Sequence, residues 1–208
     1  MPRKRICIVR ARRTPQGRFL GALSKYTPED LGVAAGEAAL AGIDPCLVDL
    51  VIVGRVLPPD LNVARVISRR LNIPNEKTAF TINMACASGM KAVQLGADAI
   101  QLGQAQVVLA GGTESMTNTP HMLEGSRHGK TLGDAKLADC LLMGLSDALL
   151  NEHMGATAQR LADQFNIDRA TQDKFAYDSH MKAISAQQRG AFDDEIIALA
   201  ELAKDEHP

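Results

Sequence analysis

The sequence predicts an α/β fold: a mainly parallel sheet with helices on both faces, followed by a more irregular, mostly helical region. Short β-branched runs alternate with longer helical stretches over the first half of the chain. The runs are continuously apolar, which is typical of strands buried on both faces of a parallel sheet. After Gly111-Gly112 this alternation of strands and helices ends. The long stretch without clear hydrophobic periodicity that follows indicates an inserted region with a functional role. We therefore expect an α/β domain over 1–115 and a separate, more irregular domain over 116–208.

Four strands and five helices are expected along the chain. Thr27-Pro28-Glu29-Asp30 combines an N-cap residue, a proline at the first helical position and acids in the first turn, so a helix begins there. Gly42, Gly103 and Gly190 favour helix ends. The strands are expected at 6–9, 50–53, 79–83 and 106–110. The helices are expected at 27–42, 62–72, 87–102, 154–165 and 169–189, while 191–208 is ambiguous between strand and helix.

Composition and charge exclude several classes of protein. The chain has 208 residues, 46% apolar and 23% charged, which is ordinary for a soluble globular protein and unlike a disordered chain. A net charge of -1 gives no general attraction to nucleic acid, and no apolar run approaches the ~20 residues that span a bilayer. We expect neither nucleic acid nor a membrane as partner. A basic cluster near the N-terminus is compatible with a nucleic-acid arm or a targeting segment, but a solvated strand edge is the simpler interpretation. The cluster comprises Arg3, Lys4, Arg5, Arg10, Arg12 and Arg13.

The cysteines indicate a reducing compartment. Cys7, Cys46, Cys86 and Cys140 form no C-x-x-C pair, and none lies beside a histidine at metal-ligand spacing. No signal-peptide pattern precedes the first apolar run. We therefore expect a cytoplasmic protein with free thiols and no metal site.

Cys86 is the strongest candidate for chemistry. A buried strand is expected to end near Asn83, and a helix that is apolar around most of its girth begins near Ala87. The helix dipole and unpaired backbone N–H groups at this start favour a thiolate nucleophile and can stabilise an oxyanion. A small buried core cysteine is the alternative interpretation.

Four ordered motifs resemble the thiolase family, and within it the acetyl-CoA acetyltransferase branch. They cover nearly the whole chain and comprise Arg13–Phe19, Asn83–Val93, Ala110–Met116 and His153–Ala158. The resemblance implies that Cys86 is acylated by acyl-CoA in a Claisen exchange of fatty acid metabolism, and that acetoacetyl-CoA is cleaved by thiolysis in the reverse direction. It implies that 116–208 is a partial, mostly helical loop domain that contacts CoA, and that Leu145, His153 and Met154 in it line the tunnel for the pantetheine arm. Without the resemblance, His153 is an ordinary helix-start histidine. Coenzyme A is then part of the substrate, no metal or redox cofactor is required, and a homo-oligomer is expected.

The resemblance covers the N-terminal half only. Asn-Glu-Ala-Phe, Gly-His-Pro and Cys-x-Gly-Gly-Gly segments of a complete thiolase do not occur here, and His207-Pro208 follows Glu206 rather than glycine. The general base and the second acid/base are therefore expected to be missing, and the 208-residue chain to be truncated and poorly active or inactive by itself.

Three interpretations remain open. The chain is a thiolase fragment or one piece of a split thiolase, completed by a complementary C-terminal half. Alternatively, it is a non-catalytic acyl-CoA-binding or assembly module. A third class is a different cysteine enzyme, such as a hydrolase that pairs Cys86 with His121, His128 or His153.

Overall fold

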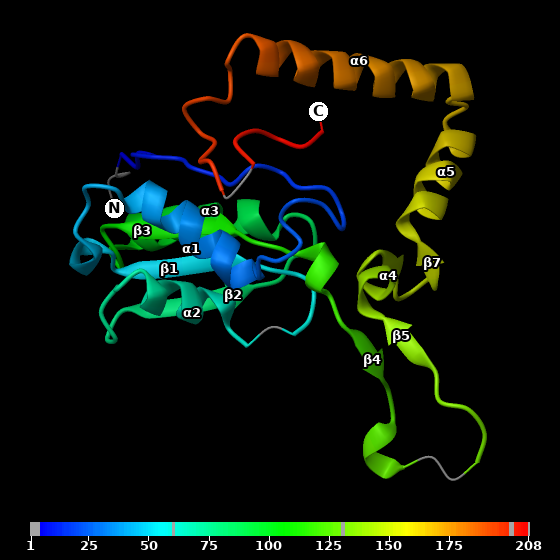
Figure 1. Ribbon diagram of the computed structural model, residues 1–208, viewed down its shortest axis with the longest axis horizontal. Helices are drawn as coiled ribbons and strands as arrows, with labels where there is room; N and C mark the ends of the chain where they lie inside the picture. Colours follow the sequence, from blue (N-terminus) through cyan, green and yellow to red (C-terminus); the bar gives the residue numbers. More distant parts are fainter. Residues whose placement is uncertain (1–4, 60, 130–131, 200–201, 208) are drawn as a thin grey trace. The chain divides into compact units, whose positions relative to one another are not determined.

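The computed structural model describes residues 5–59, 61–129, 132–199 and 202–207 (Figure 1). The chain divides into two compact units. The first unit reaches to Asn118 and also includes Asp194–His207, and the second unit spans Thr119–Asp193.

A three-stranded parallel sheet forms the centre of the first unit. Its strands are β1 (Leu50–Gly54), β2 (Thr78–Ile82) and β3 (Val108–Gly112), in the order β2-β1-β3. Gly54 at the end of β1 lies opposite Ile82 on one side and Gly112 on the other. The carboxyl ends of all three strands therefore meet at one edge of the sheet.

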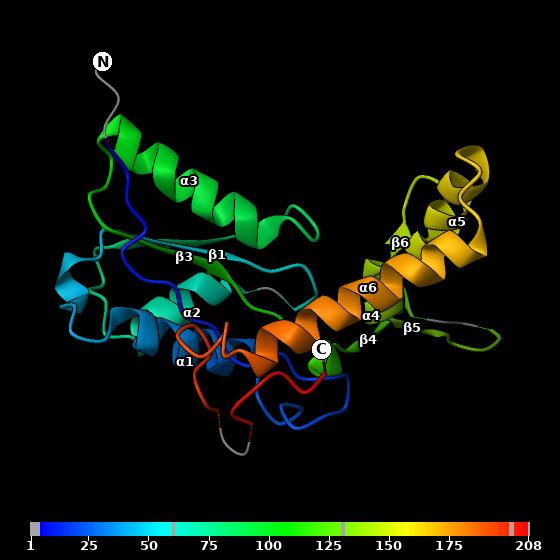
Figure 2. The same ribbon diagram turned by 90° about the horizontal axis from the view of Figure 1, so that it is seen from above.

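Helices cover both faces of this sheet, which confirms the predicted fold class. Helix α3 (Ser88–Leu102) lies on one face, and α1 (Pro28–Leu40) and α2 (Val63–Arg70) lie on the other (Figure 2). Thr27 begins α1 with a capping box, because its hydroxyl accepts from Asp30 N–H and the Asp30 carboxylate accepts from Thr27 N–H. A short 3-10 helix, Pro45–Leu47, connects α1 to β1.

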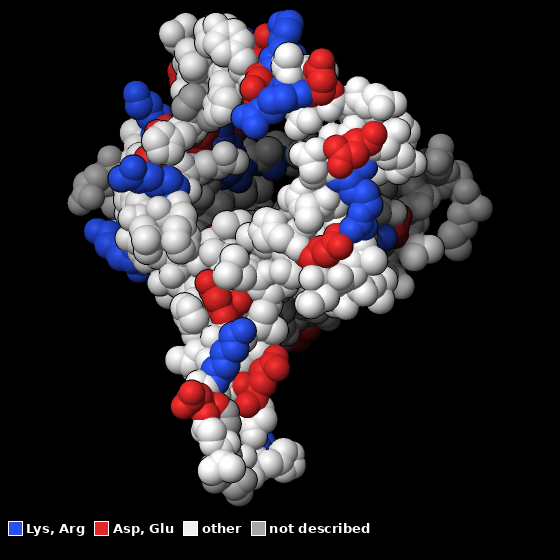
Figure 3. Space-filling view, turned by 90° about the vertical axis from the view of Figure 1, so that its right-hand side faces the viewer, with Lys and Arg blue, Asp and Glu red and all other residues white. Residues whose placement is uncertain are grey.

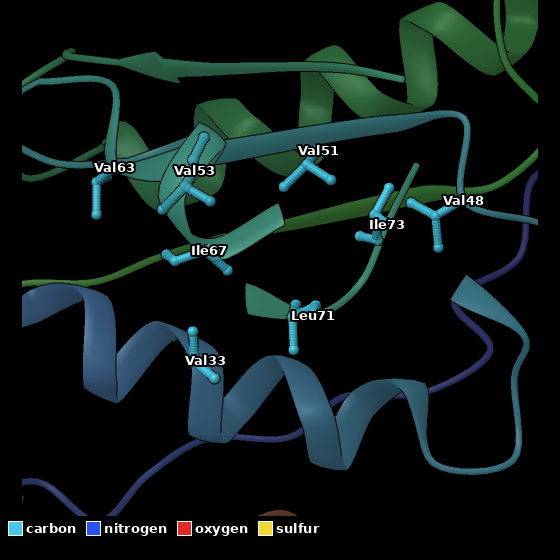
Figure 4. Packing of buried hydrophobic residues seen from close by; sticks show 9 residues of the cluster. Val33, Val48, Val51, Val53, Val63, Ile67, Leu71 and Ile73 are labelled. Carbon is cyan, nitrogen blue, oxygen red and sulfur yellow. The ribbon is translucent and has the colours of Figure 1, made fainter. Parts of the chain in front are cut away.

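The main core fills the space between the sheet and α1 and α2. Val51 and Val53 project to this side because alternate residues of a strand share a face. Ile67 and Leu71 meet them from α2 and the residue after it, and Val33 meets them from α1 (Figure 4). These β-branched and aliphatic side chains are buried, so each contributes about 1.5–3 kcal/mol to the folded state.

The predicted strand at 6–9 is wrong. Residues 6–9 have no regular structure, and Ile8 and Val9 are 79% and 82% exposed. A strand requires hydrogen bonds to a neighbouring strand, and nearby the described chain forms only one isolated bridge, from Arg13 to Ile196. The apolar, β-branched residues favour a buried strand, but a strand also needs the edge of a neighbouring sheet to pair with.

The other three predicted strands are present, with boundaries that differ from the predicted ones by one or two residues. Instead of beginning at 106, β3 begins at Val108, because the N–H groups of Gln106 and Val107 donate to the Asp49 carboxylate. Burial on both faces holds for β1, whereas the flanking strands β2 and β3 are mostly half-buried.

The second unit consists of hairpins and helices. A hairpin of β4 (His121–Leu123) and β5 (Leu137–Asp139) precedes α4 (Cys140–Gly144). A second hairpin pairs β6 (Ser146–Asp147) with β7 (Glu152–His153), and the unit ends with α5 (Met154–Gln164) and α6 (Arg169–Gln188). Two further 3-10 helices lie at Met116–Asn118, in the first unit, and Ser126–His128, in the second. The helices predicted at 154–165 and 169–189 are confirmed to within one residue.

The structure places the boundary differently from the predicted 1–115 and 116–208. The first unit extends to Asn118, and Asp194–His207 return to it. Arg13 holds this returning segment, since its guanidinium pairs with Asp205 at 2.6 Å and with Glu195 at 2.7 Å. The Arg13 guanidinium also lowers the pKa of the Asp205 carboxyl. These ion pairs join residues far apart in the chain and leave no local sequence signal. A boundary predicted from the end of the strand–helix alternation therefore did not include the returning segment.

Two basic side chains of the N-terminal cluster, those of Arg10 and Arg12, form hydrogen bonds within the chain instead of extending as a basic arm. Arg10 donates to the Ala41 carbonyl, and Arg12 donates to the Asp194 carbonyl. Arg3 and Lys4 lie outside the described residues. On the face shown in Figure 3, basic and acidic side chains are interspersed. No helix within the described residues has the length and apolar character needed to span a membrane.

Candidate active site

Cys86 lies in a tight turn between β2 and α3. The turn follows the carboxyl end of β2, and the Cys86 side chain is exposed. Residue Ala87 stands at the N-cap position and provides no side-chain hydrogen bond to the helix. The first N–H groups of α3 are therefore not capped by a neighbouring polar side chain at that position.

The backbone of this turn is held in an unusual conformation. Ala85, directly before Cys86, has a φ of 48°, in the left-handed region that non-glycine residues rarely adopt. Its N–H donates to Asn83 Oδ1 at 3.0 Å, and Asn83 Nδ2 donates to the Val56 carbonyl at 3.3 Å. Asn83 thus connects the cysteine turn to the loop that follows β1.

Glycines allow the start of α3 to approach the sheet closely. A Cβ atom at Gly54 would lie 2.5 Å from the backbone carbon of Ser88 and 2.6 Å from Gly89 N. At Gly112 a Cβ would lie 3.3 Å from Gly89 Cα. The Gly111-Gly112 pair therefore belongs to a strand end packed against the cysteine turn.

An ion-pair cluster around the buried Arg55 holds the loops beside the turn. Arg55, 7% exposed, pairs with Glu29 at 3.2 Å and with Glu114 at 3.6 Å. The second carboxylate oxygen of Glu114 accepts from the N–H groups of Val56 and Leu57 at 2.9 and 3.2 Å. The loops after β1 and β3 are fixed to each other, and the residues at the sheet edge keep their positions.

The turn offers backbone donors beside the thiol. Within the described residues, the N–H groups of Cys86 and Gly89 have no hydrogen-bond acceptor. Ser88 N–H and Lys91 N–H, in contrast, donate to the carbonyls of Ala85 and Ala87. An exposed thiol in this position can attack a carbonyl carbon. The adjacent N–H groups can then stabilise the negative oxygen that forms.

The other three predicted site residues lie together in the second unit. Leu145 is the C-cap residue that follows α4, and its carbonyl accepts from Met154 N–H at 2.9 Å, across the β6–β7 hairpin. His153 is the N-cap of α5, where its Nδ1 accepts from Gly155 N–H at 3.0 Å. The structure thus brings Leu145, His153 and Met154 to one hairpin, and the capping role expected of an ordinary helix-start histidine is present at His153.

The remaining cysteines differ in their surroundings. Cys7 is exposed, contrary to its expected place in a buried strand, because residues 6–9 pair with no strand that the structure describes. Cys140 is buried at the start of α4. Cys46 is exposed, and the carboxylate of Asp44 raises the pKa of its thiol. The described residues contain no group of three or more His, Cys, Asp or Glu side chains arranged to hold a metal ion.

Sequence reasoning missed the residues that support the turn. Gly54, Asn83 and Ser88 make its close contacts and hydrogen bonds. A small polar residue on each side of a candidate nucleophile, with a glycine at the end of the neighbouring strand, is the signal that points to them.

Comparison with known proteins identifies the family. Residues 6–207 match the family model described as thiolase, N-terminal domain. An acetyl-CoA acetyltransferase of Cupriavidus necator is 45% identical over 197 residues, which is 92% of this chain and 50% of that protein. Acetyl-CoA acetyltransferase 2 of Arabidopsis thaliana is also 45% identical, over 92% of this chain and 49% of its own length.

Solved structures agree with this result. The human mitochondrial 3-ketoacyl-CoA thiolase in complex with CoA superposes with a TM-score of 0.90 at 38% identity, over 94% of this chain and 52% of that chain. The acetyl-CoA acetyltransferase of Bacillus anthracis gives a TM-score of 0.89 at 37% identity, over 95% and 53%. The chain thus spans about half the length of these relatives. From the ordered motifs, the sheet-edge cysteine and these matches, we conclude that the chain belongs to the thiolase family and carries its N-terminal domain.

Proposed function

We propose that this chain provides the acyl-accepting cysteine of a thiolase-type acyltransferase. The observation that carries the proposal is the exposed Cys86 thiol in a chain of this family. It lies beside the N–H groups of Cys86 and Gly89, which have no acceptor among the described residues. The relatives are named acetyl-CoA acetyltransferases, and one solved relative contains CoA. The substrate class is therefore acyl-CoA, with acetyl-CoA and acetoacetyl-CoA as the first candidates.

In the first step, the Cys86 thiolate attacks the carbonyl carbon of the acyl-CoA thioester. The tetrahedral oxyanion accepts hydrogen bonds from the backbone N–H groups at the start of α3. The bond to the CoA sulfur then breaks, the CoA thiolate takes a proton, and an acyl-cysteine thioester remains. The thiol proton of Cys86 goes to solvent in the chain considered by itself. This chemistry needs only the thiol, the N–H donors and the substrate thioester, so we propose that no metal or redox cofactor takes part.

The hairpin with Leu145, His153 and Met154 is the proposed contact for the pantetheine arm. Met154 is an exposed apolar side chain, and Leu145 is half-buried next to it. An apolar hairpin surface of this kind suits a long, flexible arm with few charges.

We propose that the 208-residue chain acylates slowly and turns over poorly in its own right. We expect no general base for this thiol within this chain, because the segments that hold the acid/base residues of a complete thiolase do not occur in this sequence. A well-placed base contributes roughly 10²–10⁴ in rate. A complementary C-terminal half is the partner that would complete the site, and a homo-oligomer of this chain is the alternative assembly that we propose. The free thiols fit a reducing compartment such as the cytoplasm.

Incubation with acetyl-CoA followed by intact and peptide mass spectrometry tests this function. We expect one acetyl group on Cys86, none in Cys86→Ala, and normal uptake in the matched control Cys46→Ala. Thiolysis of acetoacetyl-CoA should be close to background. Acetylation that persists in Cys86→Ala would contradict the nucleophile assignment. Binding of acetyl-CoA without acetylation would favour the non-catalytic acyl-CoA-binding module instead.

A further inference from the structure

The Ser88 hydroxyl makes two hydrogen bonds across the cysteine turn. Ser88 is buried, and its Oγ accepts from Met84 N–H at 2.8 Å. The same hydroxyl donates to the Ala85 carbonyl at 2.6 Å, and Ser88 N–H donates to that carbonyl as well, at 3.0 Å. The carbonyl directly before Cys86 is therefore held by two donors from one residue.

Holding this carbonyl also sets the direction of the Cys86 N–H. The Ala85 carbonyl and the Cys86 N–H belong to one planar trans peptide, in which the C=O and N–H bonds point in opposite directions. With the carbonyl bound to Ser88, the N–H must point away from the serine. In that direction it has no acceptor among the described residues, so it is available to a substrate oxygen.

The backbone needs this restraint because Ala85 is strained. A non-glycine residue in the left-handed region is higher in energy by about 1–2 kcal/mol, and the peptide that follows tends to rotate toward an ordinary conformation. The hydroxyl of Ser88 opposes this rotation, whereas the Ser88 N–H alone offers one donor at the longer distance.

We infer that Ser88 is a positioning residue that aims the Cys86 backbone N–H at the oxyanion of the acyl-transfer step. The inference rests on the proposed function, since it assigns a role within that reaction. Ser88 does not touch the substrate and acts only through the Ala85–Cys86 peptide.

The test compares two reactions of the same thiol. Acetyl transfer from acetyl-CoA passes through an oxyanion, whereas alkylation by iodoacetamide is a direct displacement at carbon and forms none. We expect Ser88→Ala to slow acetylation of Cys86 about tenfold, since loosening a donor should cost less than the 10²–10³ that follows its removal. Alkylation of Cys86 should change less than about threefold, because thiol exposure is retained.

Ser68→Ala is the matched control. Ser68 is an equally buried serine on α2, and its hydroxyl has no hydrogen-bond partner among the described residues. This variant should leave both rates unchanged. An equal fall of both rates in Ser88→Ala would show general disruption of the turn and would overturn the inference, as would two unchanged rates.

Amide hydrogen exchange on the unmodified chain gives a measurement that does not depend on a variant or on catalysis. The Met84 N–H, bound to Ser88 Oγ, should exchange at least about tenfold more slowly than the unpaired Cys86 N–H. Equal exchange of the two amides would overturn the inference even if Ser88→Ala failed to fold. A chain that alkylates at Cys86 but takes no acetyl group would instead contradict the proposed function, and the exchange result would still report on Ser88.

Discussion

The thiols of this chain differ because their neighbours differ. Cys46 and Cys86 are both exposed, but Cys46 lies against the Asp44 carboxylate, which disfavours its thiolate. Cys140 is buried, so reagents reach it slowly. Cys86 is exposed, and in the described part of the chain it has no carboxylate partner and adjoins N–H groups without an acceptor.

The first prediction is that Cys86 is alkylated faster than Cys46 and Cys140 at pH 7. The raised pKa of Cys46 means that less thiolate is present at any pH below it, so its reaction is slow. Asp44→Asn removes the carboxylate, lowers that pKa and should speed alkylation of Cys46, with Cys86 unaffected. Timed alkylation with peptide mass mapping provides the measurement, and a Cys46 that reacts faster than Cys86 before the substitution would refute the order.

At the scale of elements, the contact between β1 and the start of α3 depends on Gly54. A methyl group there would meet the backbone of Ser88 and Gly89 within 2.6 Å, and backbone atoms cannot move aside as a flexible side chain can. The second prediction is that Gly54→Ala destabilises the chain by about 1–3 kcal/mol and slows alkylation of Cys86 by displacing its turn.

Gly111→Ala is the control for this change, because it adds the same methyl group on the neighbouring strand β3, where nothing lies within 4 Å. Urea unfolding measures both variants. Equal stability of Gly54→Ala and Gly111→Ala would show that α3 does not depend on this close approach.

The starts of the three strands are held together by Asp49. Its carboxylate accepts from Lys77 Nζ at 2.9 Å and from the N–H groups of Gln106 and Val107 at 2.8 and 3.2 Å. The Lys77 ammonium and these two N–H groups lower the pKa of the Asp49 carboxyl to about 2. One side chain thus connects the residues that precede β1, β2 and β3.

The third prediction concerns pH. Because the pKa of Asp49 is lowered in the folded chain, its stabilisation is fully present above the ordinary value of about 3.8 and is lost as pH falls through about 2. Asp49→Asn should therefore cost about 1 kcal/mol at pH 7, a value reduced for partial solvent exposure, and progressively less between pH 4 and about 2. Urea unfolding at each pH measures the difference. The exposed neighbour Glu76→Gln is the control, and a cost that does not change with pH would contradict the linkage.

For the whole molecule, helix α3 leaves one apolar side uncovered. Ala92, Gly96 and Ala99 face the sheet and are buried. Met90 and Val93, one turn apart, are 78% and 45% exposed. A helix with apolar residues on both sides is typical of a layer that packs against a further element.

The fourth prediction is that this chain binds a hydrophobic dye through α3. Replacing Met90 and Val93 together by Gln should lower dye fluorescence by about half and reduce self-association measured by light scattering. Val66→Gln, at a half-exposed valine on α2, is the control and should change little. Equal fluorescence of the α3 variant and the unmodified chain would place the exposed apolar surface elsewhere.

Local patterns in the sequence determined the element types and the candidate nucleophile. The capping residue Thr27 begins a helix as predicted, because capping depends on atoms three residues apart. The position of Cys86 between a strand and a helix was also predictable from local sequence. The apolar pattern of the strand and that of the helix both lie within a few residues of it.

The tertiary structure alone decided which elements meet and how the site is supported. The strand order β2-β1-β3, the contact of Gly54 with Ser88 and the pairing of Arg13 with Asp205 all join residues far apart in the chain. No local pattern encodes such pairs, because their energy appears only when the chain has closed the loop between them. Segment 6–9 shows that a local pattern alone does not determine a strand. Its residues favour an extended strand, but a strand forms only where a neighbouring strand offers free N–H and C=O groups for hydrogen bonds.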